Sequence, residues 1–161
     1  MAIAVKVQDY MARRGARYDV LTHPHSTHSA ETAELAHVPG DSVAKSVILE
    51  DEDGMVMAVL PSTCSVRLGR LSKEMNRRLR LATEEGLRHA FPDCAPGAIP
   101  PLGPAYGIRT IVDDSLELQA EIFFEGGDHE CLVHMSGEQF RALMGEAQRA
   151  HFGRRMRVAR W

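Results

Sequence analysis

Apolar side chains recur along the chain at two spacings, one typical of helices and the other typical of strands. Helical spacing, framed by capping residues before each run and by Gly or Pro after it, predicts five helices. The expected ranges are residues 3–14, 29–37, 66–79 and 83–91, and a last helix that begins at Ser136 and carries Phe140 and Leu143. Ser29, Thr83 and Ser136 are the expected N-caps, and Gln139 completes a capping box with Ser136.

Runs of β-branched and apolar residues predict the strands. Residues 45–49 and 55–60 are two such runs, and the turn-like DEDG between them predicts a hairpin. Shorter strands are expected over residues 18–22, 79–82, 108–112, 121–124 and 131–135, the last two joined by the turn EGGD. Connections this short require some antiparallel pairs, so the sheet is mixed and not doubly wound. The predicted fold class is α/β, one domain with a curved mixed sheet.

A stiff loop over residues 94–107 is the first candidate for a site. It holds four of the eight prolines and three glycines, and long loops inside compact domains are usually functional. Gly97 lets the backbone approach a ligand, whereas Pro100 and Pro101 have no N–H to donate. Gly97, Ala98 and Ile99 therefore carry the amides that would bind a carbonyl-derived oxygen. The alternative is a rigid connector that binds nothing.

Lys45 is the second candidate because it begins an otherwise apolar strand, AKSVILE. A lysine ammonium at that place can bind a phosphate or stabilise a developing oxyanion as a point charge. The alternative is a side chain that reaches past the strand edge to solvent.

The histidines and cysteines give weaker indications of a functional site. His23, His25 and His28 lie close in sequence, but no HExxH or similar carboxylate pairing accompanies them, so no metal is expected. His129 follows the Gly126–Gly127 turn and is either a polar wall of the site or an exposed turn residue, while His134 is a site wall or a core or edge residue. The three cysteines form no CxxC pair, which disfavours a disulfide framework or a zinc knuckle; Cys94 beside the stiff loop has no evident His partner.

Composition narrows the function classes. The 161 residues are 44% hydrophobic and 25% charged, as in ordinary globular domains, and no apolar run is long enough to span a bilayer. No signal-peptide core, GxGxxG or P-loop motif is present, so we expect a cytoplasmic protein without a nucleotide cofactor, membrane or DNA partner. The net charge of −3 disfavours coating of nucleic acid by overall charge. A local basic cluster near the C-terminus either contacts a nucleic-acid backbone or is a solvated tail; it comprises Arg149, Arg154, Arg155, Arg157 and Arg160.

Five segments, in order, carry a resemblance to a known family: HPHS, ETAELAHVPG, AKSVILE, PGAIPPLG and GGDHECLVHMSGEQF. Together they resemble the YbaK/EbsC family, which includes the editing domain of bacterial-type prolyl-tRNA synthetases. The similarity covers roughly residues 23–143, and its most specific parts are Lys45 and the loop Gly97 to Pro101. It implies a barrel-like sheet surrounded by helices, over residues 1–152, followed by a basic tail over residues 153–161.

The resemblance also implies a function. Such proteins are free-standing deacylases that clear mischarged aminoacyl-tRNA in trans, here with small amino acids of the Ala, Ser, Cys or Thr class, without a cofactor. Lys45 matches the functionally important lysine, and the Gly97 loop matches a pocket wall. His23 stands where some relatives have tyrosine and Ser46 where others have another polar residue, so substrate identity is open. The expected substrate-binding residues are Gly97, Ala98, Ile99, Pro100, Pro101, Ser46, His23, His25 and His129.

Two partners follow from this reading, the acceptor end of an aminoacyl-tRNA and an aminoacyl-tRNA synthetase. An ester of this kind is activated by the neighbouring ribose hydroxyl, so positioning and charge stabilisation suffice without a catalytic triad. The rival interpretation is a non-catalytic module that binds a tRNA end or a synthetase through the same pocket.

Overall fold

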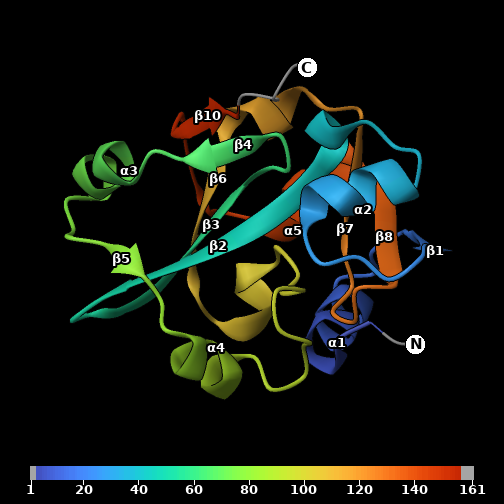
Figure 1. Cartoon of the computed structure of the whole chain (residues 1–161), viewed down its shortest axis with the longest axis horizontal. Coiled ribbons are helices and arrows are strands. Elements are labelled where there is room, and N and C mark those ends of the chain that lie inside the picture. Colours follow the sequence, from blue (N-terminus) through green and yellow to red (C-terminus); the bar gives the residue numbers. More distant parts are fainter. Residues whose placement is uncertain (1–2, 157–161) are drawn as a thin grey trace.

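The structure is a computed structural model and describes residues 3–156. Its centre is an eight-stranded sheet in the order β1-β8-β7-β2-β3-β6-β9, with β5 paired to the far end of β2 (Figure 1). The strands are β1 (Asp19–Thr22), β2 (Val43–Asp51), β3 (Gly54–Pro61), β5 (Arg80–Leu81), β6 (Arg109–Asp113), β7 (Glu121–Glu125), β8 (Cys131–Ser136) and β9 (Gln148–Ala150). A separate ribbon pairs β4 (Cys64–Val66) with β10 (Gly153–Arg155).

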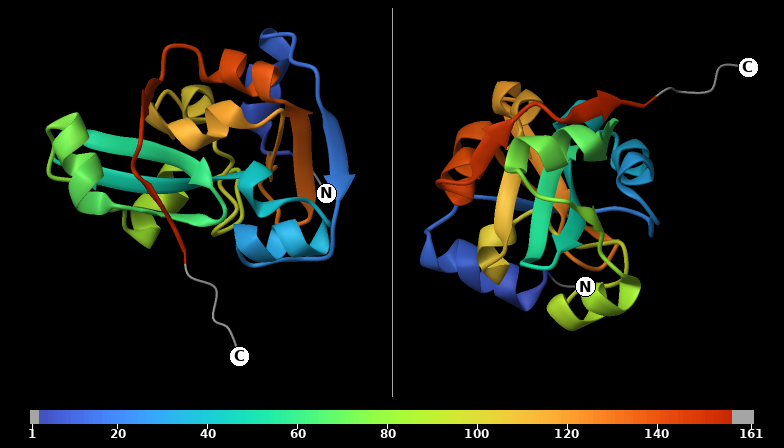
Figure 2. Two further views of the ribbon diagram at one scale, coloured as in Figure 1. Left: turned by 90° about the horizontal axis from the view of Figure 1, so that it is seen from above. Right: turned by 90° about the vertical axis from the view of Figure 1, so that its left-hand side faces the viewer.

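The sheet is mixed, as predicted. β2 and β3 form the expected antiparallel hairpin. The hairpin projects to the side of the molecule opposite the N-terminal helices and the helix that follows β8 (Figure 2). β2 pairs in parallel with β7, and β3 pairs in parallel with β6. The parallel pairs bring together strands that lie far apart in sequence, and this arrangement builds the site described below.

Five helices and three short 3₁₀ turns surround the sheet: α1 (Val5–Arg13), α2 (Ser29–Leu35), α3 (Leu68–Met75), α4 (Glu84–Ala90), α5 (Gly137–Met144), η1 (Gly40–Ser42), η2 (Gly103–Tyr106) and η3 (Asp114–Leu118). α1 and α5 pack on the largest apolar cluster, which contains Met11, Phe124 and Phe140. α3 covers a second cluster, and α2 lies over β7 and β8, where Ala33 meets Phe123 (Figure 1). The predicted α/β domain with a mixed sheet and surrounding helices is confirmed.

α2, α4 and α5 begin at residues whose side chains accept a backbone amide, and one of the predicted caps is wrong. Thr83 and Ser136 cap α4 and α5 as predicted, through bonds of 3.0 Å each from the amides of Gly86 and Gln139. The N-cap of α2 is His28 and not Ser29, because the imidazole Nδ1 accepts the Glu31 amide. The predicted helix over residues 66–79 is shorter at both ends: its first residue belongs to β4, and Asn76 takes a left-handed conformation that ends it.

Two strands near the C-terminus, β9 and β10, were not predicted. The buried carboxylate of Asp113 accepts the amides of Phe152 at 3.0 Å and Gly153 at 2.7 Å, which fixes the entry to β10. Three residues of the predicted tail thus lie in a strand, and residues 157–161 lie outside the described part. Within residues 3–156, no helix is long and apolar enough to cross a membrane.

Candidate active site

A cavity of about 290 Å³ lies where the start of β2 meets the stiff loop, the β7–β8 turn and the beginning of α2. Five of the predicted residues line it: Lys45, Ser46, Gly97, Ile99 and His129. The remaining lining residues are Thr27, His28, Ser29, Thr32, Ala44 and Glu125. The structure therefore brings together the lysine and the glycine loop, which are more than fifty residues apart in sequence.

Lys45 reaches the cavity from the centre of the sheet. β2 and β7 are parallel, with Ala44 opposite Phe124, so the next pair along places Lys45 beside Glu125. The lysine is half-buried, and its ammonium has no hydrogen bond or ion pair within residues 3–156. Burial lowers the pKa of Lys45, while the nearby Cys64 has a smaller, opposing effect. An unpaired, partly desolvated cation in a cavity wall is suited to an anionic ligand or a developing negative charge.

The loop is held in place from two sides. The Ser46 hydroxyl donates to the Ile99 carbonyl at 2.8 Å, and His129 Nε2 donates to the Pro96 carbonyl at 2.5 Å. Gly97 has φ +79°, in the left-handed region that favours glycine. This backbone conformation explains why glycine is needed at position 97.

One sequence expectation about this loop needs correction. The Ala98 amide does not face a ligand, because it donates to the Ala95 carbonyl at 3.0 Å, and Ala98 is buried. Gly97 and Ile99 keep amides with no partner within the described residues. Pro100 and Pro101, in the same loop, are buried and do not line the cavity. The loop therefore offers two amide donors to a ligand and not three.

His129 forms the wall next to Gly97. Its backbone is left-handed, with φ 66°, and its ring lies 5.3 Å from the ring of exposed His25, measured between centroids. Because Nε2 donates to a carbonyl, Nδ1 is the unprotonated nitrogen of the neutral ring. His129 thus supports the loop and contributes to the polar lining.

Behind the cavity, His23 and Glu125 form a buried pair. His23 Nε2 lies 3.0 Å from Glu125 Oε1, although the direction of approach does not make a hydrogen bond, and His23 Nδ1 donates to the Pro24 carbonyl at 2.7 Å. Thr32 Oγ1 lies 3.1 Å from the same Oε1. Burial raises the pKa of Glu125, and the His23 ring acts in the opposite direction. His23, expected in the substrate-binding set, lies beneath the cavity and contacts it through Glu125.

Sequence reasoning did not single out Glu125. The available signal was an acidic residue at the end of the apolar strand EIFFE, which mirrors Lys45 at the start of its own apolar strand.

The other histidines take separate positions. His28 caps α2, and His134 pairs with Glu121 and stacks on Phe123 outside the cavity. Within residues 3–156 the one group of three possible metal ligands is Asp113, Asp114 and His151, which includes none of the N-terminal histidines. Asp113 already accepts hydrogen bonds from backbone amides and from Ser115.

A second cavity, of about 390 Å³, lies on the far side of the same loop. Leu87, Phe91 and Cys94 line it together with Gly97 and Ile99. Burial raises the pKa of Cys94 to about 12, which leaves it a protonated thiol at neutral pH. Cys94 is therefore poorly suited to act as a nucleophile.

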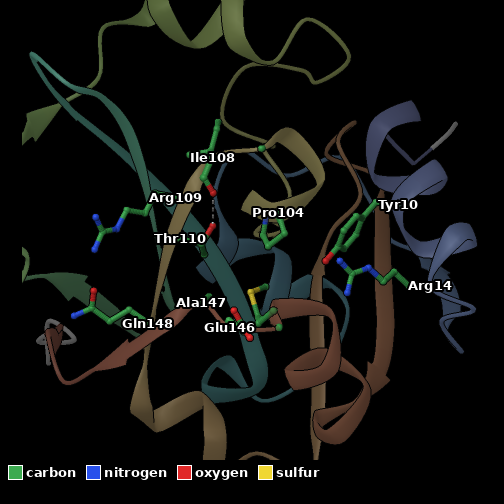
Figure 3. Close-up of a pocket in the computed structure, with 12 residues that line it drawn as sticks. Tyr10, Arg14, Pro104, Ile108, Arg109, Thr110, Glu146, Ala147 and Gln148 are labelled. Atoms are coloured by element: carbon green, nitrogen blue, oxygen red, sulfur yellow. Dashed lines mark hydrogen bonds between the residues drawn. The ribbon is translucent and has the colours of Figure 1, made fainter.

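A larger cavity, of about 710 Å³, is lined by none of the site residues predicted from the sequence. It is an open hollow between α1, the start of β6 and the connection from α5 to β9 (Figure 3). Arg14 lies over the Tyr10 ring, with the guanidinium carbon 4.9 Å from the ring centroid. We place the candidate active site at the smaller cavity because Lys45, with its unpaired ammonium, lines it together with Gly97 and Ile99, whose amides are unpaired.

The fold and this cavity define a class of protein: a mixed-sheet α/β domain whose pocket is walled by a glycine loop and a lysine. The family model of the aminoacyl-tRNA editing domain matches residues 23–143. The chain therefore belongs to the aminoacyl-tRNA editing domain family, as its resemblance to YbaK/EbsC proteins predicted.

Solved structures agree with this assignment. A crystal structure of a candidate trans-editing enzyme for prolyl-tRNA synthetase is 26% identical, with a TM-score of 0.80 over 94% of this chain and 96% of that chain. A hypothetical protein, APE2540, shares the fold at 22% identity, with a TM-score of 0.79 over 92% of this chain and 99% of that one. A scaffold used for computational epitope grafting also shares it, at 21% identity and a TM-score of 0.81, over 95% and 97% of the two chains. No curated protein sequence matches the chain.

Proposed function

We propose that this protein is a free-standing deacylase that hydrolyses the ester of a mischarged aminoacyl-tRNA carrying a small amino acid. One observation carries the proposal: half-buried Lys45 lines one small cavity together with Gly97 and Ile99, whose amides have no partner within residues 3–156. Membership of the editing-domain family supports an aminoacyl-tRNA substrate. The similarity to a candidate trans-editing enzyme supports action in trans, in the cytoplasm where tRNA is charged.

The proposed mechanism relies on positioning and charge. The Gly97 and Ile99 amides hold the ester carbonyl oxygen, and Lys45 stabilises the oxyanion or holds the phosphate of the terminal adenosine. A water molecule, oriented by the neighbouring ribose hydroxyl of the substrate, attacks the carbonyl carbon and gives up a proton. The ester C–O bond then breaks, and the ribose oxygen leaves with a proton. One such oxyanion donor typically contributes about 10²–10³ in rate.

Cavity size supports selection for small side chains. The volume of about 290 Å³ must also hold the ester and part of the ribose, and Ala44 and Ile99 close the apolar part of the wall. A pocket of this kind separates substrates that differ by one methylene only modestly, but it rejects large side chains by steric clash. Alanyl, seryl, cysteinyl and threonyl esters are the proposed substrates. In a cysteinyl ester the substrate thiol can itself attack, with the protein as a binding template.

The test is a deacylation screen of mischarged tRNAs with the wild type, Lys45→Ala and Lys73→Ala. Lys73 is exposed on α3 and serves as the matched control. We expect Lys45→Ala to lower kcat/KM at least 100-fold and Lys73→Ala to leave it within twofold. Full activity of Lys45→Ala would refute the role of the lysine. Tight binding of an uncleavable aminoacyl-adenosine analogue without turnover would support the non-catalytic module instead.

A further inference from the structure

The carboxylate of Glu125 lies at the candidate active site but has no part in the mechanism proposed above. Glu125 lines the cavity and its side chain is buried, with 8% of the residue exposed. Its Oε1 faces Thr32 and His23, at 3.1 Å and 3.0 Å. Its Oε2 is fully buried and has no hydrogen-bond partner within residues 3–156. Thr32 therefore faces one oxygen of the carboxylate, and the other oxygen has no donor among the described residues.

An unpaired buried carboxylate oxygen is costly, because it has lost its hydration without gaining a donor. Lys45, on the adjacent strand β2, forms no ion pair with it within the described residues. His23 approaches only Oε1, and its other ring nitrogen is committed to the Pro24 carbonyl. A ligand that supplies a hydrogen-bond donor would compensate the unpaired carboxylate, and a positively charged donor would form the strongest hydrogen bond with it.

The substrate supplies such a donor at the required place. In an aminoacyl ester the amino group is bonded to the carbon next to the carbonyl carbon, and it is protonated near neutral pH. If the amides of Gly97 and Ile99 hold the carbonyl oxygen, the ammonium must lie within the same cavity, of which Glu125 forms another wall. The cavity thus presents a cation and two amides to the negative parts of the substrate, and a carboxylate to its positive part.

We propose that the Glu125 carboxylate binds the α-ammonium group of the aminoacyl moiety. Glu125 therefore selects esters with a free α-amine over hydroxyacyl and N-acylated esters. This inference rests on the proposed function of the same site, since it needs an acyl-tRNA in the cavity. An approaching ammonium favours the ionised carboxylate, so binding of substrate opposes the rise in the pKa of Glu125 that burial causes.

The experiment compares alanyl-tRNA with lactyl-tRNA, in which a hydroxyl replaces the amine and the rest of the substrate is unchanged. Each rate is divided by the uncatalysed hydrolysis rate of the same ester, because the ammonium itself activates the carbonyl. The variants are Glu125→Gln and the control Glu130→Gln, an exposed residue of the loop that precedes β8. We expect the wild type to prefer the alanyl ester about tenfold or more, as for a charge-assisted hydrogen bond.

Glu125→Gln should lower kcat/KM for alanyl-tRNA about tenfold or more and leave lactyl-tRNA within twofold. Glu130→Gln should leave both unchanged, and Lys45→Ala should lower both alike. Equal corrected values of kcat/KM for the two esters with the wild type would overturn the ammonium site and leave the deacylase proposal intact. Hydrolysis of neither ester overturns the deacylase proposal. If Glu125→Gln fails to fold, the wild type alone still tests the ammonium site. Its kcat/KM for alanyl-tRNA is then compared with the values for lactyl-tRNA and for N-acetylalanyl-tRNA, in which the amine is blocked.

Discussion

Ser46→Ala isolates the contribution of loop position to catalysis. The Ser46 hydroxyl is the donor that fixes the Ile99 carbonyl, at 2.8 Å, and with it the neighbouring amides of the loop. Loss of this hydrogen bond leaves a half-buried carbonyl without a donor, at a cost of about 1–2 kcal/mol. If that cost falls on the catalytically competent loop conformation, kcat falls about 5- to 30-fold, because 1.36 kcal/mol corresponds to a factor of ten.

The assay is single-turnover hydrolysis of alanyl-tRNA at saturating enzyme, with thermal unfolding measured in parallel. The same 1–2 kcal/mol lowers Tm by about 3–6 °C in a domain of this size. Ser46→Thr keeps the hydroxyl and should retain most of the rate, and Ser65→Ala, at an exposed position of β4, is the neutral control. An unchanged kcat together with a lowered Tm would show that Ser46 stabilises the fold without positioning the loop for the reaction.

Three further predictions concern the loop, the C-terminal strand and the buried thiol. Gly97→Ala should reduce deacylation about tenfold, because φ +79° costs an L residue about 1–2 kcal/mol; Gly69→Ala, in open space on α3, should slightly raise Tm. Asp113→Asn should destabilise the protein to urea by about 2–3 kcal/mol. Burial raises the pKa of Asp113, but hydrogen bonds from Ser115, Phe152 and Gly153 outweigh it and lower the pKa below 3.8, so wild type and variant should converge as acid protonates the carboxylate. Cys94, with its pKa near 12, should resist iodoacetamide at pH 8 until the protein unfolds, and Cys94→Ala should keep full activity; mass spectrometry and the deacylation assay check these points.

The sequence was informative where one residue type answers a local need. Gly97 stands out because its left-handed backbone conformation disfavours every other residue type. Lys45 stands out because an apolar residue would suit the start of an apolar strand better. The hairpin and the caps Thr83 and Ser136 were predicted for a similar reason, since turn and cap chemistry act within a few residues, whereas the cap of α2 was placed one residue too late.

The errors arose where distant segments decide the outcome. The Ala98 amide looked available because nothing in the sequence shows its bond to Ala95 within a tight turn. β9 and β10 were missed because three-residue strands carry no periodic signal, and their partners, β6 and β4, are remote. The side chains of His23 and Glu125 meet only after β1 and β7 have been placed by the sheet.

The parallel pairing of β2 with β7 also has a consequence for folding kinetics. Lys45, Gly97 and Glu125 belong to three segments that approach one another only when strands separated by about eighty residues have paired. Long-range parallel contacts of this kind form late, because the chain entropy of closing the intervening loop must be overcome first. Refolding monitored by secondary structure should therefore be faster than the recovery of the proposed deacylase activity, because that activity requires the completed central sheet.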